Sequence, residues 1–186
     1  NDGGQIFQNN ANIYAKFNMG IENPTSWSDE TSKDGWQFIS SPFNAAQISL
    51  FTGLFVPRSY DLYKYDGTQD LEWINHKSET EFEETFVNGR GYLASYETLT
   101  SVELAGYIYN AKSFSWDNLT YKADKDLANF NLLGNPFPFD MDMSKAAYTN
   151  LVEGYAVVNP ADGGYKYVSV GSAHNPADGT IKVGDG

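Results

Sequence analysis

Two stretches of the sequence repeat one pattern far apart, and this repetition constrains the fold more than any other feature. Residues 35–49 read GWQFISSPFNAAQIS and residues 129–143 read NFNLLGNPFPFDMDM. Each stretch places an apolar or aromatic residue at every second position, then two small or turn-forming residues, then Pro-Phe. Pro42 and Pro136 stand 94 positions apart. An alternating run that ends in such a turn predicts a strand and a corner, here formed twice.

Two further landmarks follow the Pro-Phe motif in the same order in both halves of the chain. A hairpin-like run begins at residue 60 (YDLYKYDG, then LEWIN) and again at residue 154 (GYAVVNPADGG, then YKYVS). A Gly-x-Gly run then ends at Gly91 in the first half and 95 positions later at Gly186 in the second. The constant order and spacing predict a duplicated unit of about 90 residues. We place its copies at about 20–110 (unit 1) and about 115–186 (unit 2), after an N-terminal strand in residues 1–19.

The dominant period of the sequence is two. Ile13, Ala15, Phe17 and Met19 alternate with polar or exposed-type residues, as in a half-buried strand. Later runs show the same alternation, including SFSWDNLTYKA at 113–123, and Gly, Pro, Asn and Asp separate them. The sequence therefore predicts an all-β fold, a sandwich of the jelly-roll-like kind, with one domain over residues 1–186 and little helix. The best helical candidate is a turn or two within 142–153.

The repeated pattern also predicts a core and two corners. We expect the core to contain the side chains that recur in the two copies of the inner strand, namely Trp36, Phe38, Phe130, Leu132 and Leu133. The residue pairs before each proline let the backbone bend, and proline ends the ladder because it has no N–H group. The following phenylalanine, Phe43 or Phe137, should then close the end of the core. Such a corner lets a strand leave one sheet for the other.

The second unit stops where the first continues into YLASYETLTSVELAGYIYN at 92–110, so we expect unit 2 to lack its last strand. Two alternatives remain open at this point. The closing strand belongs to a longer polypeptide, or residues 1–19 supply it. We favour the second alternative, which predicts a single intertwined sandwich.

Charge and composition exclude several classes of function. The formal net charge is −12, and no cluster of Lys or Arg offsets it, so nucleic acid is not expected as a partner. No apolar run approaches the roughly 20 residues that span a bilayer, so membrane insertion is not expected. The chain has no cysteine, which excludes disulfides and thiolate metal sites.

Several motifs together resemble a known group of proteins. The runs GGQIFQNN, DGWQFISSPF, DLYKYDG, NGRGYLAS, LAGYIYN and FNLLGNPFPFDMDMS are similar to tandem β-sandwich modules of large secreted and surface proteins of the Bacteroidota, the cargo of type IX secretion. The likeness covers nearly the whole chain. It implies a secreted or cell-surface location and an adhesin-like or spacer role. It brings no set of catalytic residues with it.

The sequence contains no set of residues that we recognise as catalytic. The two histidines, His76 and His174, stand in polar, loop-like contexts, where surface positions are expected. We find no metalloprotease, nucleophile-elbow or phosphate-loop motif. A glycoside hydrolase with paired carboxylates is a remote alternative, because 24 acidic residues make close pairs common by chance.

The aromatic residues near the first hairpin are the candidate ligand-binding set. Tyr60, Tyr63, Tyr65 and Trp73 could form a platform on which sugar rings or apolar groups of a partner stack. The alternative is that they only pair across the strands and stabilise the hairpin.

Two aspartates form the candidate metal site. Asp140 and Asp142 lie two positions apart, so a strand would point both to one face, and carboxylates are typical Ca²⁺ ligands. No cofactor is predicted, and Ca²⁺ stays an open alternative.

The sequence thus predicts a non-catalytic, extracellular interaction or spacer module. Its expected partner is a host or matrix protein or a glycan. The alternative is a carbohydrate-binding module that uses the exposed aromatic face of the hairpin.

Overall fold

The computed structural model describes residues 13–27, 35–48, 59–78, 82–98, 101–109, 111, 113–121, 130–149, 154–158, 165–169 and 180–186. Nearly all regular structure in these ranges is antiparallel β, which confirms the predicted fold class. The elements are β1 (Tyr14–Gly20), β2 (Gln37–Ile39), β3 (Phe43–Asn44), β4 (Tyr60–Tyr65), β5 (Trp73–Asn75), β6 (Tyr92–Tyr96), β7 (Ser101–Ile108), β8 (Met141–Asp142), the 3-10 turn η1 (Met143–Lys145), β9 (Gly154–Val158), β10 (Tyr165–Ser169) and β11 (Thr180–Ile181). Among the described residues, no helix is long and apolar enough to cross a membrane.

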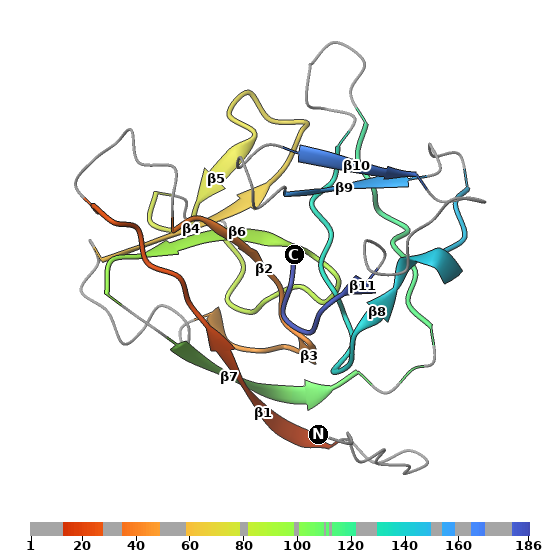
Figure 1. Ribbon diagram of the computed structural model, residues 1–186, viewed down its shortest axis with the longest axis horizontal. Coiled ribbons are helices and arrows are strands. Elements are labelled where there is room, and N and C mark those ends of the chain that lie inside the picture. The colour runs from red at the N-terminus through yellow and green to blue at the C-terminus, as the bar shows by residue number, and fades with distance from the viewer. Residues whose placement is uncertain are drawn as a thin grey trace.

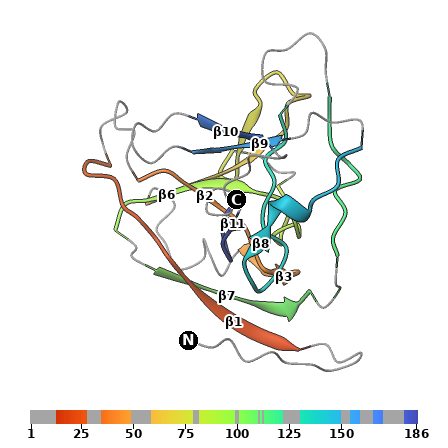
Figure 2. The same ribbon diagram turned by 45° about the vertical axis from the view of Figure 1, so that its right-hand side comes forward.

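Two sheets from the first unit enclose the main core. One sheet has the strand order β2-β6-β4-β5, and the other has the order β1-β7-β3. Figures 1 and 2 show them as separate layers, with β1 and β7 forming the lower edge of the molecule. Ile39 and Tyr92 from the first sheet join Met19 and Leu104 from the second in one buried cluster. This packing of two antiparallel sheets on a shared core is that of a β-sandwich.

The predicted alternation of buried and exposed side chains in the N-terminal strand is confirmed in β1. Tyr14, Lys16 and Asn18 are exposed, whereas the residues between them are half-buried and Met19 is buried. All seven residues of β1 pair with β7, from Tyr14 opposite Tyr107 to Gly20 opposite Ser101. Residues Tyr14–Gly20 therefore belong to the sheet of β7 in the first unit, which corrects the favoured alternative for these residues, while residues 1–12 lie outside the described residues.

The first Pro-Phe motif forms the predicted corner. The chain leaves the four-stranded sheet at the end of β2 and enters the other sheet at β3, so it changes layers across Ser40, Ser41 and Pro42. The Phe43 N–H donates to Ser41 Oγ at 3.2 Å, which fixes the bend. Phe43 then lies in the core at 2% exposure.

The second Pro-Phe motif repeats this geometry with an asparagine in place of serine. The Phe137 N–H donates to Asn135 Oδ1 at 2.9 Å. Asn135 and Pro136 are fully buried, and Phe137 stacks on Phe139 with ring centroids 5.0 Å apart. The amide nitrogen of Asn135 also donates to the carbonyl oxygens of Phe139 and Ile181, at 2.9 and 3.0 Å. One buried side chain thus holds this corner to the strand that precedes the C-terminal turn.

Each corner contacts the Gly-x-Gly turn of the other unit. The Ser40 N–H donates to the carbonyl of Gly184 at 2.7 Å, and the Gly134 N–H donates to the carbonyl of Gly89 at 2.9 Å. Isolated bridges join Ile39 to Asp185 and Leu133 to Arg90. Because equivalent residues exchange equivalent bonds, the two halves meet across a pseudo-two-fold arrangement. These contacts agree with a duplicated unit, and the duplication itself stays a prediction.

The two glycine turns also match in backbone and in packing. Gly89 and Gly184 have φ values of 77° and 87°, a region that favours glycine, at the third position of a turn. A Cβ added at Gly89 would meet the Phe114 ring at 2.4 Å, and one added at Gly184 would meet the Phe17 ring at 2.9 Å. Residues near 114 in the second unit therefore occupy the place that β1 has in the first.

The hairpins match as well. β4 pairs with β5 and β9 pairs with β10, both antiparallel. The bridge between Gln47 and Thr85 corresponds to the pairing of β8 with β11, in which Asp142 faces Thr180. The helical candidate at 142–153 is realised as the short turn η1, while residues 150–153 lie outside the described residues.

Two strand predictions in the second unit are wrong. Residues 113–121 are not a strand, although they alternate as predicted, and residues 130–133 form one isolated bridge in place of a strand. Their counterparts in the first unit, β1 and β2, pair with β7 and β6. No described strand takes those central positions in the second unit, so the alternating segments have no ladder to join.

The predicted core set also needs correction. Trp36 is 40% exposed and Phe130 is 55% exposed, while Phe38, Leu132 and Leu133 are only partly buried. The two equivalent positions thus have similar environments, but they lie on the outer side of their segments. The core is built from the neighbouring positions, such as Ile39.

Removal of the two equivalent corner side chains should have unequal effects on stability. Asn135→Ala leaves a buried backbone N–H and several carbonyls without their partner, so we expect the free energy of unfolding to fall by about 2–3 kcal/mol. Ser41→Ala removes a smaller group and should cost about 1 kcal/mol. Urea unfolding of both variants measures the difference. Equal, small losses would show that Asn135 does not hold the corner.

Candidate functional site

The outer side of the sheet β2-β6-β4-β5 carries a continuous set of aromatic side chains. Strand register places Phe38, Leu93, Tyr63 and Asn75 in one row across the four strands, because each is paired with the next. Tyr65 and Trp73 form the neighbouring pair. We define the aromatic face by five residues on this side of the sheet: Trp36, Phe38, Tyr63, Tyr65 and Trp73.

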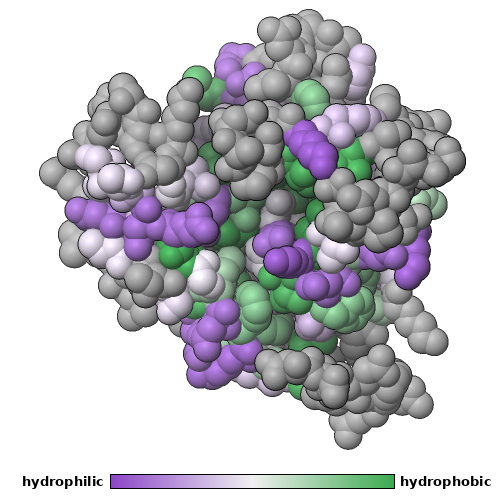
Figure 3. All heavy atoms as spheres, viewed as in Figure 1, coloured by the Kyte–Doolittle hydropathy of each residue, from purple (hydrophilic) through white to green (hydrophobic). Residues whose placement is uncertain are grey.

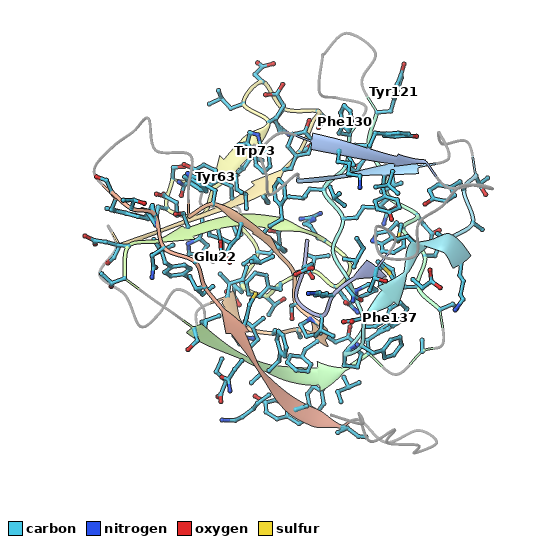
Figure 4. The ribbon with its side chains drawn as sticks, viewed as in Figure 1. Glu22, Tyr63, Trp73, Tyr121, Phe130 and Phe137 are labelled. Atoms are coloured by element: carbon cyan, nitrogen blue, oxygen red, sulfur yellow. The ribbon has the colours of Figure 1, made fainter. Side chains whose placement is uncertain are left out.

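Ring contacts connect the members of the aromatic face. Trp36 and Tyr63 have ring centroids 5.9 Å apart, and Phe38 and Trp73 stack with centroids 6.4 Å apart and planes 14° from parallel. Tyr65 meets Trp73 edge-on at 5.1 Å. Trp36 is exposed and the other four are half-buried. The rings therefore support one another and still reach the surface. Figure 4 shows Tyr63 and Trp73 beside the β4–β5 hairpin.

A polar group of side chains borders the aromatic face. Asn75 Nδ2 donates to Asp61 Oδ1 at 2.9 Å, and Lys77 Nζ lies 3.1 Å from the same oxygen. Asp61 lies on β4 on the same side as Tyr63, and Asn75 stands directly opposite Tyr63. The site thus combines planar apolar rings with a carboxylate, an amide and an ammonium group. Figure 3 shows hydrophobic and hydrophilic side chains next to each other on the face in view.

The structure separates Tyr60 from the other members of the predicted set. Tyr60 points to the core side of β4, is 6% exposed and stacks on Tyr96 with centroids 6.0 Å apart. Its position follows from the period of two, which places it with Leu62 and opposite Tyr63. Tyr60 is therefore a core residue and not part of a binding surface, which corrects that prediction.

His76 is packed into the structure and is not a simple surface residue as expected. Its Nδ1 lies 3.1 Å from the Tyr60 hydroxyl, and its ring meets Phe82 edge-on with centroids 5.0 Å apart. Burial lowers the pKa of His76 below its ordinary value of 6.5. His174 lies outside the described residues.

A charged cluster lies at the core side of the same sheet. Glu83 contacts both Lys64, at 3.3 Å, and Arg90, at 2.5 Å. Burial opposes ionisation of Glu83, but a backbone hydrogen bond and the two cations outweigh it, so the pKa of Glu83 is lowered. Lys64 also lies over the Phe82 ring. The cluster joins β4 to the turn before β6 and has a structural role.

The two predicted Ca²⁺ ligands each contact protein groups. Asp140 Oδ1 accepts a hydrogen bond from the Val183 N–H at 3.2 Å, and Asp142 pairs with Lys145 at 3.1 Å. In the part of the chain that the structure describes, no group of three or more His, Cys, Asp or Glu residues could hold a metal ion. A Ca²⁺ site at Asp140 and Asp142 stays a prediction.

Sequence reasoning identified three of the five residues of the aromatic face. Tyr63, Tyr65 and Trp73 come from one hairpin, whose Asp66-Gly67 turn is visible in the sequence. The sequence pattern predicts core positions for Trp36 and Phe38, and it gives no signal for the polar border. Their placement depends on β6 lying between β2 and β4, which local pattern does not show.

Comparison of the chain with protein-family models, with curated proteins and with solved structures gives no match.

The lowered pKa of His76 predicts a pH-dependent stability. Unfolded histidine takes up a proton near pH 6.5, whereas folded His76 does so only at lower pH. Between these two pKa values the unfolded state therefore binds more protons than the folded state. Stability should be full above about pH 6.5 and fall as the pH drops below it. His76→Gln should reduce this loss of stability at low pH, while His174 is left in place in both proteins. Urea unfolding at several pH values tests the prediction, and an equal pH slope in both proteins would contradict it.

Proposed function

We propose that the chain is a non-catalytic recognition module of a secreted or cell-surface protein, and that its aromatic face binds glycan. The observation that carries the proposal is the set of half-exposed, mutually supported rings on one side of a four-stranded sheet. The secreted location and the adhesin-like role are supported by the sequence motifs that resemble modules of bacterial surface proteins.

Sugar rings suit this surface because they have one apolar side and a polar rim. Aromatic rings contact the apolar side, and neighbouring polar groups bond the hydroxyls. The rings of Trp73 and Phe38 stack with nearly parallel planes, and the polar border of Asp61, Asn75 and Lys77 lies next to Tyr63. The amide and carboxylate accept bonds from hydroxyls, and the ammonium donates to them. The arrangement offers both kinds of contact within one site.

The net charge narrows the class of glycan. A chain with a formal charge of −12 repels polyanions such as sulfated or uronic-acid-rich polysaccharides. Lys77, the cation at the border, is already paired with Asp61. We therefore propose a neutral glycan as the ligand.

The hydrogen bonds of the acidic residue beside the aromatic face also agree with a recognition role. Asp61 bonds Asn75 and Lys77, which orients its carboxylate as part of a border. A glycoside hydrolase needs two carboxyl groups roughly 5–10 Å apart on either side of the scissile bond. The function proposed needs only the stacking and hydrogen bonding that the described residues provide.

Substitution of the stacked ring should weaken glycan binding without unfolding the domain. Trp73→Ala removes a ring that contacts both Phe38 and Tyr65, and we expect binding to weaken by roughly tenfold or more, which corresponds to about 1.4 kcal/mol. Binding is measured on an array of neutral and acidic glycans and matrix proteins, with and without Ca²⁺.

Tyr14→Ala serves as the control, because Tyr14 is an exposed aromatic residue on the other sheet. It should leave glycan binding unchanged. An array with no bound glycan, or equal binding by the wild type and Trp73→Ala, would overturn the proposal. A blank array would favour a spacer role.

A further inference from the structure

The members of the aromatic face fall into two groups that follow each other along β4. Tyr63 and Tyr65 stand two positions apart on this strand, so their side chains leave the same side of the sheet about 7 Å apart. In β5, Asn75 pairs with Tyr63 and Trp73 pairs with Tyr65, so this strand repeats the same step. Figure 4 shows Tyr63 and Trp73 at neighbouring places on the hairpin. The ring contacts follow the same division.

The first group, which we call the polar end, consists of Trp36 and Tyr63. Their ring centroids are 5.9 Å apart, and their planes are tilted by 55°. Trp36 is exposed, and Asn75 stands directly opposite Tyr63. The Asn75 amide donates to the Asp61 carboxylate at 2.9 Å, which fixes both groups beside the rings. The polar end therefore combines ring surface with groups that bond hydroxyls.

The second group, which we call the apolar end, consists of Phe38, Tyr65 and Trp73. Trp73 stacks on Phe38 with planes 14° from parallel, and it meets Tyr65 edge-on. All three side chains are half-buried, so they contact one another and still reach the surface. Asn75 and Asp61 lie at the other end of the face. The apolar end therefore offers chiefly ring surface.

We propose that the aromatic face binds a neutral oligosaccharide over two consecutive sugar units, one at each end, with the sugar chain along β4. This inference rests on the proposed function and names the form of its ligand. The step between the two ends, about 7 Å along the strand, is of the order of the length of one linked sugar unit. One unit stacks on the polar end and bonds its fixed groups, and the next gains from ring contact alone. The polar end selects the sugar, and the apolar end adds affinity for a longer chain.

The two tryptophans should therefore differ in their effect on binding. Trp73→Ala removes the central ring of the apolar end, so it should abolish the gain in affinity from the second sugar unit and leave the binding of a single unit unchanged. Trp36→Ala removes the exposed ring of the polar end, so it should weaken the binding of every chain length by a similar factor and leave that gain intact. An undivided surface would give both variants the same effect.

The probes are the neutral oligosaccharides of cellulose, xylan, mannan and starch, each from the single sugar to the hexasaccharide. Their affinities for the full chain are measured by NMR titration, which detects weak binding. In at least one series we expect the affinity of the wild type to rise by roughly tenfold from the single sugar to the disaccharide. This rise should fall to about twofold or less in Trp73→Ala and stay near tenfold in Trp36→Ala.

Matched variants separate ring loss from general damage. Trp73→Phe and Trp36→Phe keep a ring at each end and should restore most of the wild-type pattern. Tyr121→Ala removes an exposed ring outside the aromatic face and should change nothing. Urea unfolding checks that each variant is folded.

Two results would overturn the inference and leave glycan binding in place. They are equal affinity of the wild type for all lengths of every series that binds, and equal effects of Trp36→Ala and Trp73→Ala on the rise with length. No binding to any probe, together with no bound glycan on the array, would overturn the inference and the proposed function at once.

Discussion

The contact between each Pro-Phe corner and the glycine turn of the opposite unit is the interaction on which the rest of the fold depends. A strand that ends at a corner leaves backbone groups without ladder partners, and buried backbone groups must be bonded. Here the other half of the chain bonds them: Gly184 accepts from Ser40, and Gly89 accepts from Gly134. Each corner thus takes one of its backbone hydrogen bonds from the other half of the chain, and the two halves form one joint that links residues far apart in sequence.

This joint also explains why small residues stand where they do. Gly91 and Gly186 lie against the carbonyl oxygens of Leu133 and Ile39, where a Cβ would approach to 2.7 and 2.5 Å. The close approach lets the turn of one unit pack directly on the strand end of the other. The buried Asn135 then connects the second corner to the backbone before the C-terminal turn. Bulkier residues at these positions would separate the two halves.

Much of the first unit could be predicted from the sequence, and most of the second could not. Alternation and the turn residues beside it suffice to predict β1, the β4–β5 hairpin and both corners, because each of these features depends on neighbouring positions in the sequence. Residues 113–121 alternate just as clearly, yet they are not a strand, since a strand exists only with a partner. Alternation could also have separated Tyr60 from Tyr63, which are an odd number of positions apart. The position of Trp36 depended on strand order, which local pattern does not contain.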